Sequence, residues 1–310
     1  MRGNGRPLIG MRVDVDTSVG LARGVPRILD LLDRYGARGT FYVVMGPDTM
    51  GVHVKRLRKK DYWKRIWRVN PLRLVKSYGL GPFFYGTLLP SPKVGQGHPE
   101  MVRDIAARGH EVGLHSYNHA RWADHHELLT EAELRGEFER CIEIYGEILG
   151  MRPRTSAAPN WRCNWRILQF EEELGFRYLS DLRGVSAFYP ARGEQRLGTL
   201  QVPQTLPTTH ECLQDGRATK GDVIEFIFDN HVRPDRLNVF TIHDWLEGLS
   251  DPELLDQLLK RAGDGGYQVV GLDRSAECEQ GNRVFSDITT GAIQGGIGDV
   301  SLQESAVDGV

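Results

Sequence analysis

The sequence contains few cysteines, and their positions match no metal-binding or disulfide pattern. The four cysteines lie far apart in the 310 residues, and no two of them have the CxxC spacing. We therefore expect neither a disulfide framework nor a structural zinc module built from paired cysteines.

Long apolar runs and a strong net charge are also lacking. No stretch of eighteen apolar residues occurs, so the sequence predicts no transmembrane helix. The formal net charge is -2, which means that any affinity for nucleic acid or membrane must come from a local patch. The remaining composition, 40% hydrophobic and 26% charged, is that of an ordinary globular protein.

What the sequence does contain is a regular alternation of strand-like and helix-like segments. The strand-like segments are 8–16, 39–45, 110–115, 176–180, 237–243 and 267–272. The helix-like segments are 25–35, 99–108, 130–149, 165–174, 221–231 and 252–262. Such alternation favours parallel strands. Because His115, Asp181 and His243 all lie at the ends of predicted strands, we expect a barrel with its site at their carboxyl ends.

Two carboxylates, Asp14 and Asp16, end the first predicted strand. Side chains alternate along a strand, so both project from the same side. An isolated pair of this kind could simply face solvent. A divalent cation bound by one carboxylate would relieve their repulsion and leave the other to act as a base.

Three histidines also lie at strand ends. His115 and His119 follow a predicted buried strand, four residues apart, and His243 ends a later one. A histidine pair at the surface and a lone structural histidine are the alternative interpretations. Together with the aspartates, the pair makes an Asp/His/His set that leaves a coordination position open for water, as metal-assisted amide hydrolysis requires. His243 is then a candidate general acid.

These motifs resemble the metal-dependent polysaccharide deacetylase superfamily. Its features are a paired-aspartate motif, an H-[ST]-x-x-H motif and a late strand ending in Ile/Leu-His, and the resemblance spans residues 8–272. Within the superfamily the chain is most similar to the deformylases that act on 4-deoxy-4-formamido-L-arabinose-phosphoundecaprenol. The segments that carry this similarity are 12–17, 46–51, 110–115, 156–162, 180–184, 205–208 and 241–243.

The resemblance implies a distorted (β/α) barrel of the polysaccharide deacetylase type, with about seven strands. It also implies a role for individual residues. Asp16, His115 and His119 would bind one divalent metal ion, zinc in the first place, with manganese or cobalt as alternatives. Asp14 would be the general base, and His243 would protonate the departing amine. The segment 159–162 stands where the superfamily has an Arg-x-Pro-Tyr motif, which this chain does not spell. The candidate substrate contacts are Trp161, Arg162, Asp181, Arg183 and Glu247.

The activity implied is removal of a formyl group from a lipid-linked amino sugar, a step of lipid A modification that confers polymyxin resistance. Two alternatives remain open at this point. A soluble N-deacetylase of chitin-like or peptidoglycan sugars would share the chemistry. A non-catalytic protein that binds lipid-linked sugars would be expected to lose Asp14 or a metal ligand, and all of these residues are present.

An insertion at 46–98 interrupts the alternation. Residues 52–76 carry ten Lys/Arg against one acid, together with tryptophans. They could form a charged helical face that covers the barrel, or a membrane-surface element that binds lipid phosphate. The residues proposed for membrane or lipid-phosphate contact are Lys59, Lys60, Trp63, Lys64, Arg65 and Trp67. We expect a peripheral protein on the cytoplasmic face of the bacterial inner membrane, and no nucleic-acid partner.

The chain is expected to form one catalytic domain over residues 1–278, with the insertion as an appendage. Residues 279–310 are rich in Gly, Ser, Asp and Gln and show no sustained periodicity. Such a composition predicts a disordered tail.

Overall fold

The computed structural model of the chain describes residues 2–3, 5–54, 79–281, 283–296 and 298–304. Its centre is a parallel sheet around the long strand β2 (Arg6–Val15), in which the last eight residues are all buried. Strands buried on both faces are typical of sheets that are covered by helices on the outside. The first predicted strand is thereby confirmed.

The main sheet contains nine strands in the described part of the chain. From β2 the order runs through β3 (Thr40–Val43), β4 (Glu111–Leu114), β5 (Thr155–Ser156), β6 (Tyr178–Leu179) and β9 (Leu200–Gln201), all parallel. Strands β10 (Val239–His243) and β11 (Gln268–Val270) also pair with β2 in parallel, and β1 (Arg2–Gly3) pairs with it antiparallel.

The sheet curls toward closure. The backbone N–H of Leu206, just after β9, donates to the carbonyl of Val239 in β10 at 3.1 Å. This bond links the last strand of the path to the neighbour of the first. The expected distorted (β/α) barrel is confirmed.

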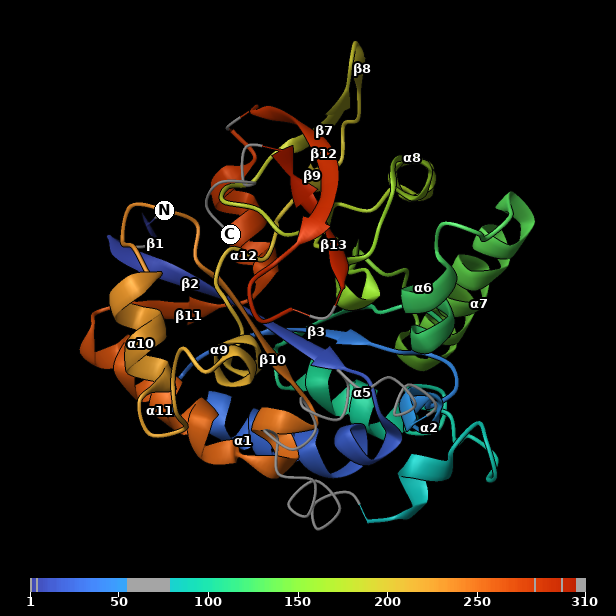
Figure 1. Cartoon of the computed structure of the whole chain (residues 1–310), viewed down its shortest axis with the longest axis horizontal. Coiled ribbons are helices and arrows are strands. Elements are labelled where there is room, and N and C mark those ends of the chain that lie inside the picture. Colours follow the sequence, from blue (N-terminus) through green and yellow to red (C-terminus); the bar gives the residue numbers. More distant parts are fainter. Residues whose placement is uncertain (1, 4, 55–78, 282, 297, 305–310) are drawn as a thin grey trace.

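Helices cover the sheet. Figure 1 places α1 (Val25–Arg34), α5 (Pro99–Ala107) and α11 (Pro252–Asp264) along one side of it. The other helices are α2 (Met50–Val54), α6 (His119–His125), α7 (Glu131–Leu149), α8 (Trp165–Leu174), α9 (Thr209–Asp215), α10 (Val223–Asn230) and α12 (Leu272–Glu279). The long helix α7 begins with a capping box between Thr130 and Glu133.

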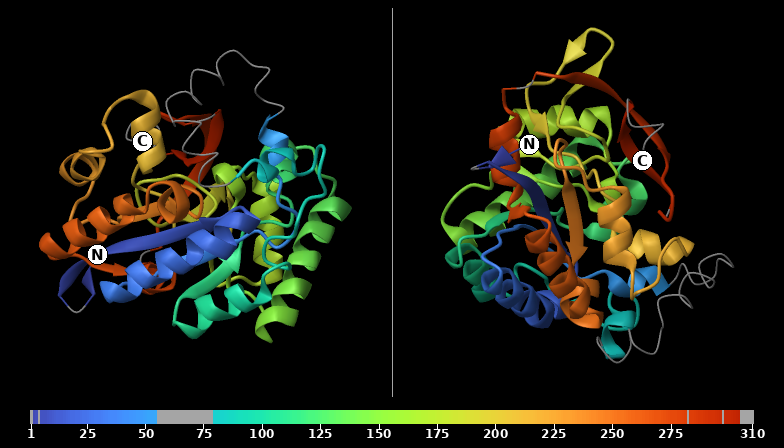
Figure 2. Two further views of the ribbon diagram at one scale, coloured as in Figure 1. Left: turned by 90° about the horizontal axis from the view of Figure 1, so that it is seen from below. Right: turned by 90° about the vertical axis from the view of Figure 1, so that its left-hand side faces the viewer.

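A second, smaller sheet lies on the opposite side of the main sheet from α1, α5 and α11 (Figure 2). Its strand order is β13 (Asp299–Gln303), β12 (Phe285–Ala292), β7 (Tyr189–Arg192) and β8 (Gln195–Arg196). Strand β12 runs parallel to β7 and antiparallel to β13.

The prediction of a disordered tail is wrong for residues 285–296 and 298–303. Val300 and Leu302 are buried in a cluster with Ile293 and Trp161. Val300 and Leu302 alternate with polar residues, but the polar composition of the whole segment gave no indication of a strand. Strand β13 is stabilised by partners more than a hundred residues away, which a local sequence pattern does not reveal. The boundary predicted at 278 therefore separates segments that share one sheet. Residues 305–310 lie outside the described part.

The described parts of the insertion are 46–54 and 79–98. They contain α2 and the short 3-10 helix η3 (Gly81–Phe84). The candidate membrane contacts Lys59, Lys60, Trp63, Lys64, Arg65 and Trp67 lie outside the described residues. Among the helices that the structure does describe, none is long and apolar enough to span a bilayer.

Candidate active site

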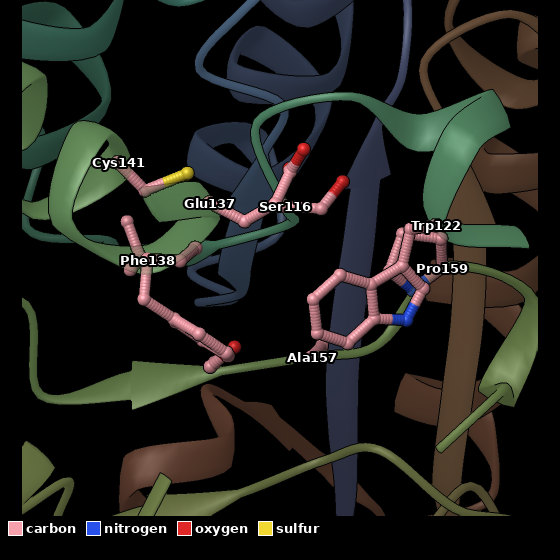
Figure 3. A pocket seen from close by; sticks show the side chains of 9 residues that line it. Ser116, Trp122, Glu137, Phe138, Cys141, Ala157 and Pro159 are labelled. Carbon is pink, nitrogen blue, oxygen red and sulfur yellow. The ribbon is translucent and has the colours of Figure 1, made fainter. Parts of the chain in front are cut away.

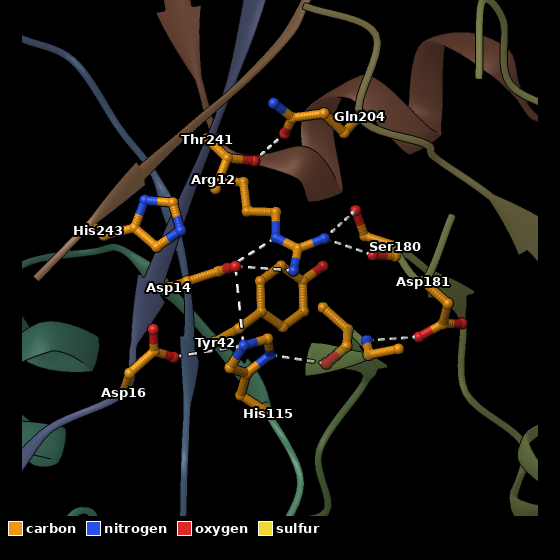
Figure 4. Close-up of polar contacts among 12 residues, drawn as sticks. Arg12, Asp14, Asp16, Tyr42, His115, Ser180, Asp181, Gln204, Thr241 and His243 are labelled. Atoms are coloured by element: carbon orange, nitrogen blue, oxygen red, sulfur yellow. Dashed lines mark hydrogen bonds and ion pairs between the residues drawn. The ribbon is translucent and has the colours of Figure 1, made fainter. Parts of the chain in front are cut away.

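The carboxyl ends of β2, β4 and β10 bring the predicted site residues together (Figure 4). His243 pairs with Asp14 in the strand register, and Val43 of β3 lies between Val15 and Leu114. Asp16 and His115 follow these strands directly. Sequence-distant residues therefore meet because parallel strands end at one edge of the sheet.

His119 reaches the same edge from the start of α6. The chain turns there through Ser116, whose φ of 66° lies in the left-handed region. Asn118 caps α6 by accepting a hydrogen bond from the backbone of Arg121 at 3.0 Å. The turn and the cap together direct the imidazole of His119 back toward β2.

Asp16, His115 and His119 form a compact group of potential metal ligands. The Oδ1 atom of Asp16 lies 3.4 Å from Nε2 of His115 and 3.6 Å from Nε2 of His119. One ligand atom from each of the three lies within 4.8 Å of the others. The Nδ1 atom of His115 donates to the carbonyl of Ala157 at 2.7 Å, so its Nε2 lone pair is turned toward the group.

Two atoms of this group fit a cation well. Within the described part of the chain, Oδ1 of Asp16 and Nε2 of His115 are buried without a hydrogen-bond partner. Burial, together with the charges of Asp244 and Asp14, raises the pKa of Asp16 well above its usual range. Buried polar atoms without partners are costly, and a divalent cation would satisfy both and favour the carboxylate form.

The histidine ligand is in the right protonation state for such a cation. Burial lowers the pKa of His115 to about 4, against the opposing effect of Asp14. His115 is therefore neutral near pH 7, which is the state that coordinates a metal.

Asp14 lies beside this group and is held by Arg12. The guanidinium donates from Nε to Oδ1 of Asp14 at 2.7 Å and from the second terminal nitrogen to Oδ2 at 2.8 Å. Burial alone would raise the pKa of Asp14, but Arg12 and then His115 lower it below its usual range. The carboxylate is thus kept ionised although it is almost completely buried.

Arg12 was not among the predicted site residues. Its guanidinium also donates to the carbonyl of Ser180 at 2.5 Å and lies over the rings of Tyr42 and Trp161, 5.3 Å from each centroid. A signal was present in the sequence, because Arg12 shares a strand face with Asp14 and is charged within a buried strand.

His243 lies opposite Asp14 at the end of β10. Burial lowers the pKa of His243, and the negative charge of Asp14 opposes this. The backbone N–H of His243 donates to Oε2 of Glu247 at 2.9 Å, and the other oxygen of Glu247 accepts from the hydroxyl of Thr209. Burial raises the pKa of Glu247 to about 7. A direct contact between Glu247 and substrate stays a prediction.

Asp244 connects the end of β10 to the loop that follows β2. It was also not among the predicted site residues. Its Oδ2 accepts from the backbone N–H of Thr17 at 3.0 Å and from the Thr17 hydroxyl at 2.9 Å. Gly20 packs so close that an added Cβ would lie 1.8 Å from this oxygen. The loop after Asp16 is therefore fixed to the end of β10.

The other expected substrate contacts surround the turn after β5. Trp161, in the 3-10 turn η4 (Pro159–Trp161), lies near two guanidinium groups: that of Arg12 is 5.3 Å and that of Arg183 is 4.9 Å from its ring centroid. Arg183 is buried and paired with Glu211 at 3.0 Å. Asp181 accepts from the backbone of Ala158 at 2.8 Å.

The hydrogen bond from Ala158 to Asp181 and the contacts of Trp161 with the two arginines hold the turn after β5 in place. Arg162 likewise reaches carbonyl oxygens of the protein, including that of Asp299 at 3.2 Å. Substrate contact by any of Trp161, Arg162, Asp181 and Arg183 stays a prediction.

A small cavity lies between the end of β4 and α7 (Figure 3). It is lined by Leu114, Ser116, Trp122, Glu137, Phe138, Cys141, Ser156, Ala157 and Pro159. One of the lining residues, Glu137, forms an ion pair with Arg121 at 3.2 Å. The cavity thus borders the backbone that carries His115.

Comparison with known proteins shows which family this chain resembles. Residues 7–179 match the family model of polysaccharide deacetylases. A protein of Shewanella sediminis described as a probable 4-deoxy-4-formamido-L-arabinose-phosphoundecaprenol deformylase is 32% identical over 304 residues, which is 97% of this chain and 96% of that protein. A protein of Wigglesworthia glossinidia brevipalpis with the same description is 27% identical, covering 93% and 100%.

Solved structures share the fold. A protein of Mycobacterium smegmatis described as a polysaccharide deacetylase superposes with a TM-score of 0.59 at 20% identity, covering 92% of this chain and 94% of that one. A peptidoglycan deacetylase of Bacillus subtilis gives 0.52 at 16% identity, covering 90% and 96%.

Proposed function

The chain belongs to the polysaccharide deacetylase family, and on this premise we propose that it removes the formyl group from 4-deoxy-4-formamido-L-arabinose-phosphoundecaprenol. The products are formate and 4-amino-4-deoxy-L-arabinose still attached to its lipid phosphate. This reaction belongs to lipid A modification and polymyxin resistance. The relatives that carry this description match nearly the whole chain.

The observation that carries the proposal is the meeting of Asp14, Asp16, His115, His119 and His243 at one sheet edge. Of these, Asp16, His115 and His119 would hold one divalent ion, zinc in the first place, with manganese or cobalt as alternatives. When bound, such an ion polarises the amide carbonyl and lowers the pKa of water.

The remaining chemistry belongs to the side chains. Asp14, kept ionised by Arg12, accepts the proton of the attacking water on its carboxylate. His243 lies across from it and delivers a proton to the nitrogen as the C–N bond breaks. Trp161, in the turn after β5, and Arg183, whose guanidinium lies 4.9 Å from the Trp161 ring, orient the sugar.

A lipid-linked substrate requires the enzyme to come to the membrane surface. Four large apolar side chains of the insertion are solvent-exposed, namely Leu80, Phe84, Leu88 and Leu89. Exposed apolar side chains beside a basic segment are typical of proteins that lie in the headgroup layer. We place the protein on the cytoplasmic face of the bacterial inner membrane, as a peripheral protein.

The test is formate release from the formamido-arabinose lipid by the purified protein, with and without chelator. The Asp14→Asn variant serves as a control for contaminating activity. Chelator-sensitive release by the parent protein and none by the variant is the expected result. Faster cleavage of an N-acetylglucosamine oligomer than of the formamido lipid would instead establish a soluble N-deacetylase, and binding of the lipid without formate release would establish a binding protein.

A further inference from the structure

The turn after β5 has an unusual backbone. Asn160 and Trp161 are consecutive and have φ angles of 54° and 52°, in the left-handed region that residues other than glycine rarely adopt. Such conformations persist only where the surrounding structure holds them. The turn places the indole of Trp161 against the guanidinium of Arg12, at 5.3 Å.

Strand β13 holds this turn from the C-terminal side. The hydroxyl of Ser301 accepts from the backbone N–H of Cys163 at 3.0 Å and donates to the carbonyl of Cys163 at 2.7 Å. The carbonyl of Asp299 accepts from Nε of Arg162 at 3.2 Å. Apolar residues of the same hairpin pack with Trp161, namely Ile293, Val300 and Leu302.

The strand is itself anchored on the segment after β6. The backbone N–H of Arg183 donates to the carbonyl of Ser301, and that of Gln303 donates to the carbonyl of Arg183, both at 2.9 Å. The side-chain oxygen of Gln303 accepts from the backbone of Val185 at 3.0 Å and of Ser186 at 3.3 Å. Strand β13 therefore bridges two segments that border the site.

A continuous path leads from β13 to the carboxylate that takes the proton. Ser301 fixes the backbone next to Trp161, the indole of Trp161 lies on the guanidinium of Arg12, and Arg12 binds both oxygens of Asp14. None of residues 285–303 falls within the matched family segment 7–179.

We propose that β13 is a positioning element of the active site, with Ser301 as its positioning residue: it holds Trp161 in the left-handed turn, and through Trp161 it fixes the orientation of Arg12 and Asp14. This proposal rests on the proposed function, because the positioning role is measured through the deformylation reaction. It assigns a role in catalysis to the C-terminal hairpin.

The test compares two serine-to-alanine variants of the same hairpin. Ser301→Ala removes both hydrogen bonds to Cys163. Ser286→Ala, on β12, removes a hydroxyl that, within the described part of the chain, donates to the neighbouring carbonyl of Asp287 at 3.1 Å. For Ser301→Ala we expect kcat on the formamido-arabinose lipid to fall by about tenfold, with KM within about twofold and metal content unchanged, because orientation of the base affects the transition state rather than binding.

Four further outcomes decide the proposal. Ser301→Thr keeps the hydroxyl and should recover most of the lost kcat, and Ser286→Ala should match the parent protein. An unchanged kcat in Ser301→Ala overturns the proposal. Equal losses of kcat and melting temperature in both alanine variants also overturn it, because they indicate general support by the hairpin.

Amide hydrogen exchange separates this proposal from the proposed function, because it needs no substrate. Exchange at Trp161, Arg162 and Cys163 should accelerate in Ser301→Ala and not in Ser286→Ala. If the parent protein releases no formate, the proposed function fails, while unchanged exchange at the turn in Ser301→Ala overturns the positioning role independently.

Discussion

Arg12 and Asp14 are two residues apart on the same face of β2 and form a buried ion pair through two parallel hydrogen bonds, at 2.7 and 2.8 Å. The side chains have almost no solvent exposure, so water does not screen the pair. Removing one partner from such a pair leaves the other buried and uncompensated. The pair therefore sets both the charge and the direction of the carboxylate that we assign as general base.

Replacing Arg12 by Lys keeps the positive charge but loses the planar two-point contact. Burial raises the pKa of Asp14, and the lysine would oppose this effect less strongly than the arginine does, so the pKa should rise. Because the ionised form is the active base, the acid limb of the kcat/KM profile should move to higher pH, and activity near pH 6 should fall by at least about tenfold. The measurement is kcat/KM between pH 5 and 9. An acid limb at the parent's position would contradict the role of Arg12.

Mutations should distinguish the candidate metal ligands from the general base by their effects on metal content and turnover. His119→Ala removes one of three candidate ligands around Oδ1 of Asp16 and should lower both metal content and turnover. Asp14→Asn should keep the metal and lose turnover, because it changes the base and leaves the three ligands in place. Metal analysis after gel filtration distinguishes the two. Full metal content in His119→Ala would rule out this ligand assignment.

The residues that approach the site along strands could be predicted from the sequence. Alternation of side chains gives Asp14 and Asp16 the same face, and the apolar run before His115 predicts a buried strand end. The order of the parallel strands then brings them together. Local pattern was sufficient here because strands and helices have fixed periods.

The long-range hydrogen bonds that hold the site residues in place could not be predicted in this way. The pairing of Thr17 with Asp244 joins residues 227 apart, and Ser301 reaches Cys163 across 138 residues. Each contact depends on tertiary packing rather than on local periodicity. The left-handed backbone at Trp161 gives no sequence signal, because glycine, the residue that usually marks such a conformation, is absent there.

A carboxylate on the main sheet should make stability depend on pH. Burial raises the pKa of Glu111 to about 7, and its Oε2 accepts from Thr40 at 2.7 Å and from the hydroxyl of Tyr178. Between the ordinary pKa of 4.5 and this value, the folded state binds more protons than the unfolded state, so the free energy of unfolding falls as pH rises. The loss attributable to Glu111 is on the order of 3 kcal/mol, reached above about pH 7.

Urea unfolding of the parent protein and of Glu111→Gln at pH 5 and pH 8 measures this contribution. The neutral amide should flatten the pH dependence and leave the variant more stable than the parent at pH 8. Equal slopes for the two proteins would show that Glu111 does not titrate in this range.

Membrane attachment should depend on the basic part of the insertion. Each basic residue near an anionic surface contributes about 1 kcal/mol, so changing Lys59, Lys60, Lys64 and Arg65 to Glu should release the protein from anionic liposomes. A matched control makes the same charge change at four other basic residues that are exposed, namely Arg152, Arg154, Arg192 and Lys260. Flotation with liposomes is the measurement. Unchanged flotation of the insertion variant would mean that the segment covers the barrel instead.

The preference for formyl over acetyl should be real but partial. In the binding mode that we propose, a methyl group in place of the formyl hydrogen must fit between the candidate metal ligands and Trp161. The ring of Trp161 is held near the guanidinium groups of Arg12 and Arg183, at 5.3 and 4.9 Å. One carbon in a pocket is worth about 1–3 kcal/mol, so kcat/KM on the acetamido-arabinose lipid should be lower by about 10- to 200-fold. Trp161→Phe keeps an aromatic ring but is smaller, so it should narrow this ratio by improving the acetamido substrate. Turnover of both lipids by parent and variant gives the ratio. A variant that loses activity on both lipids equally would show that Trp161 orients Arg12 without selecting the acyl group.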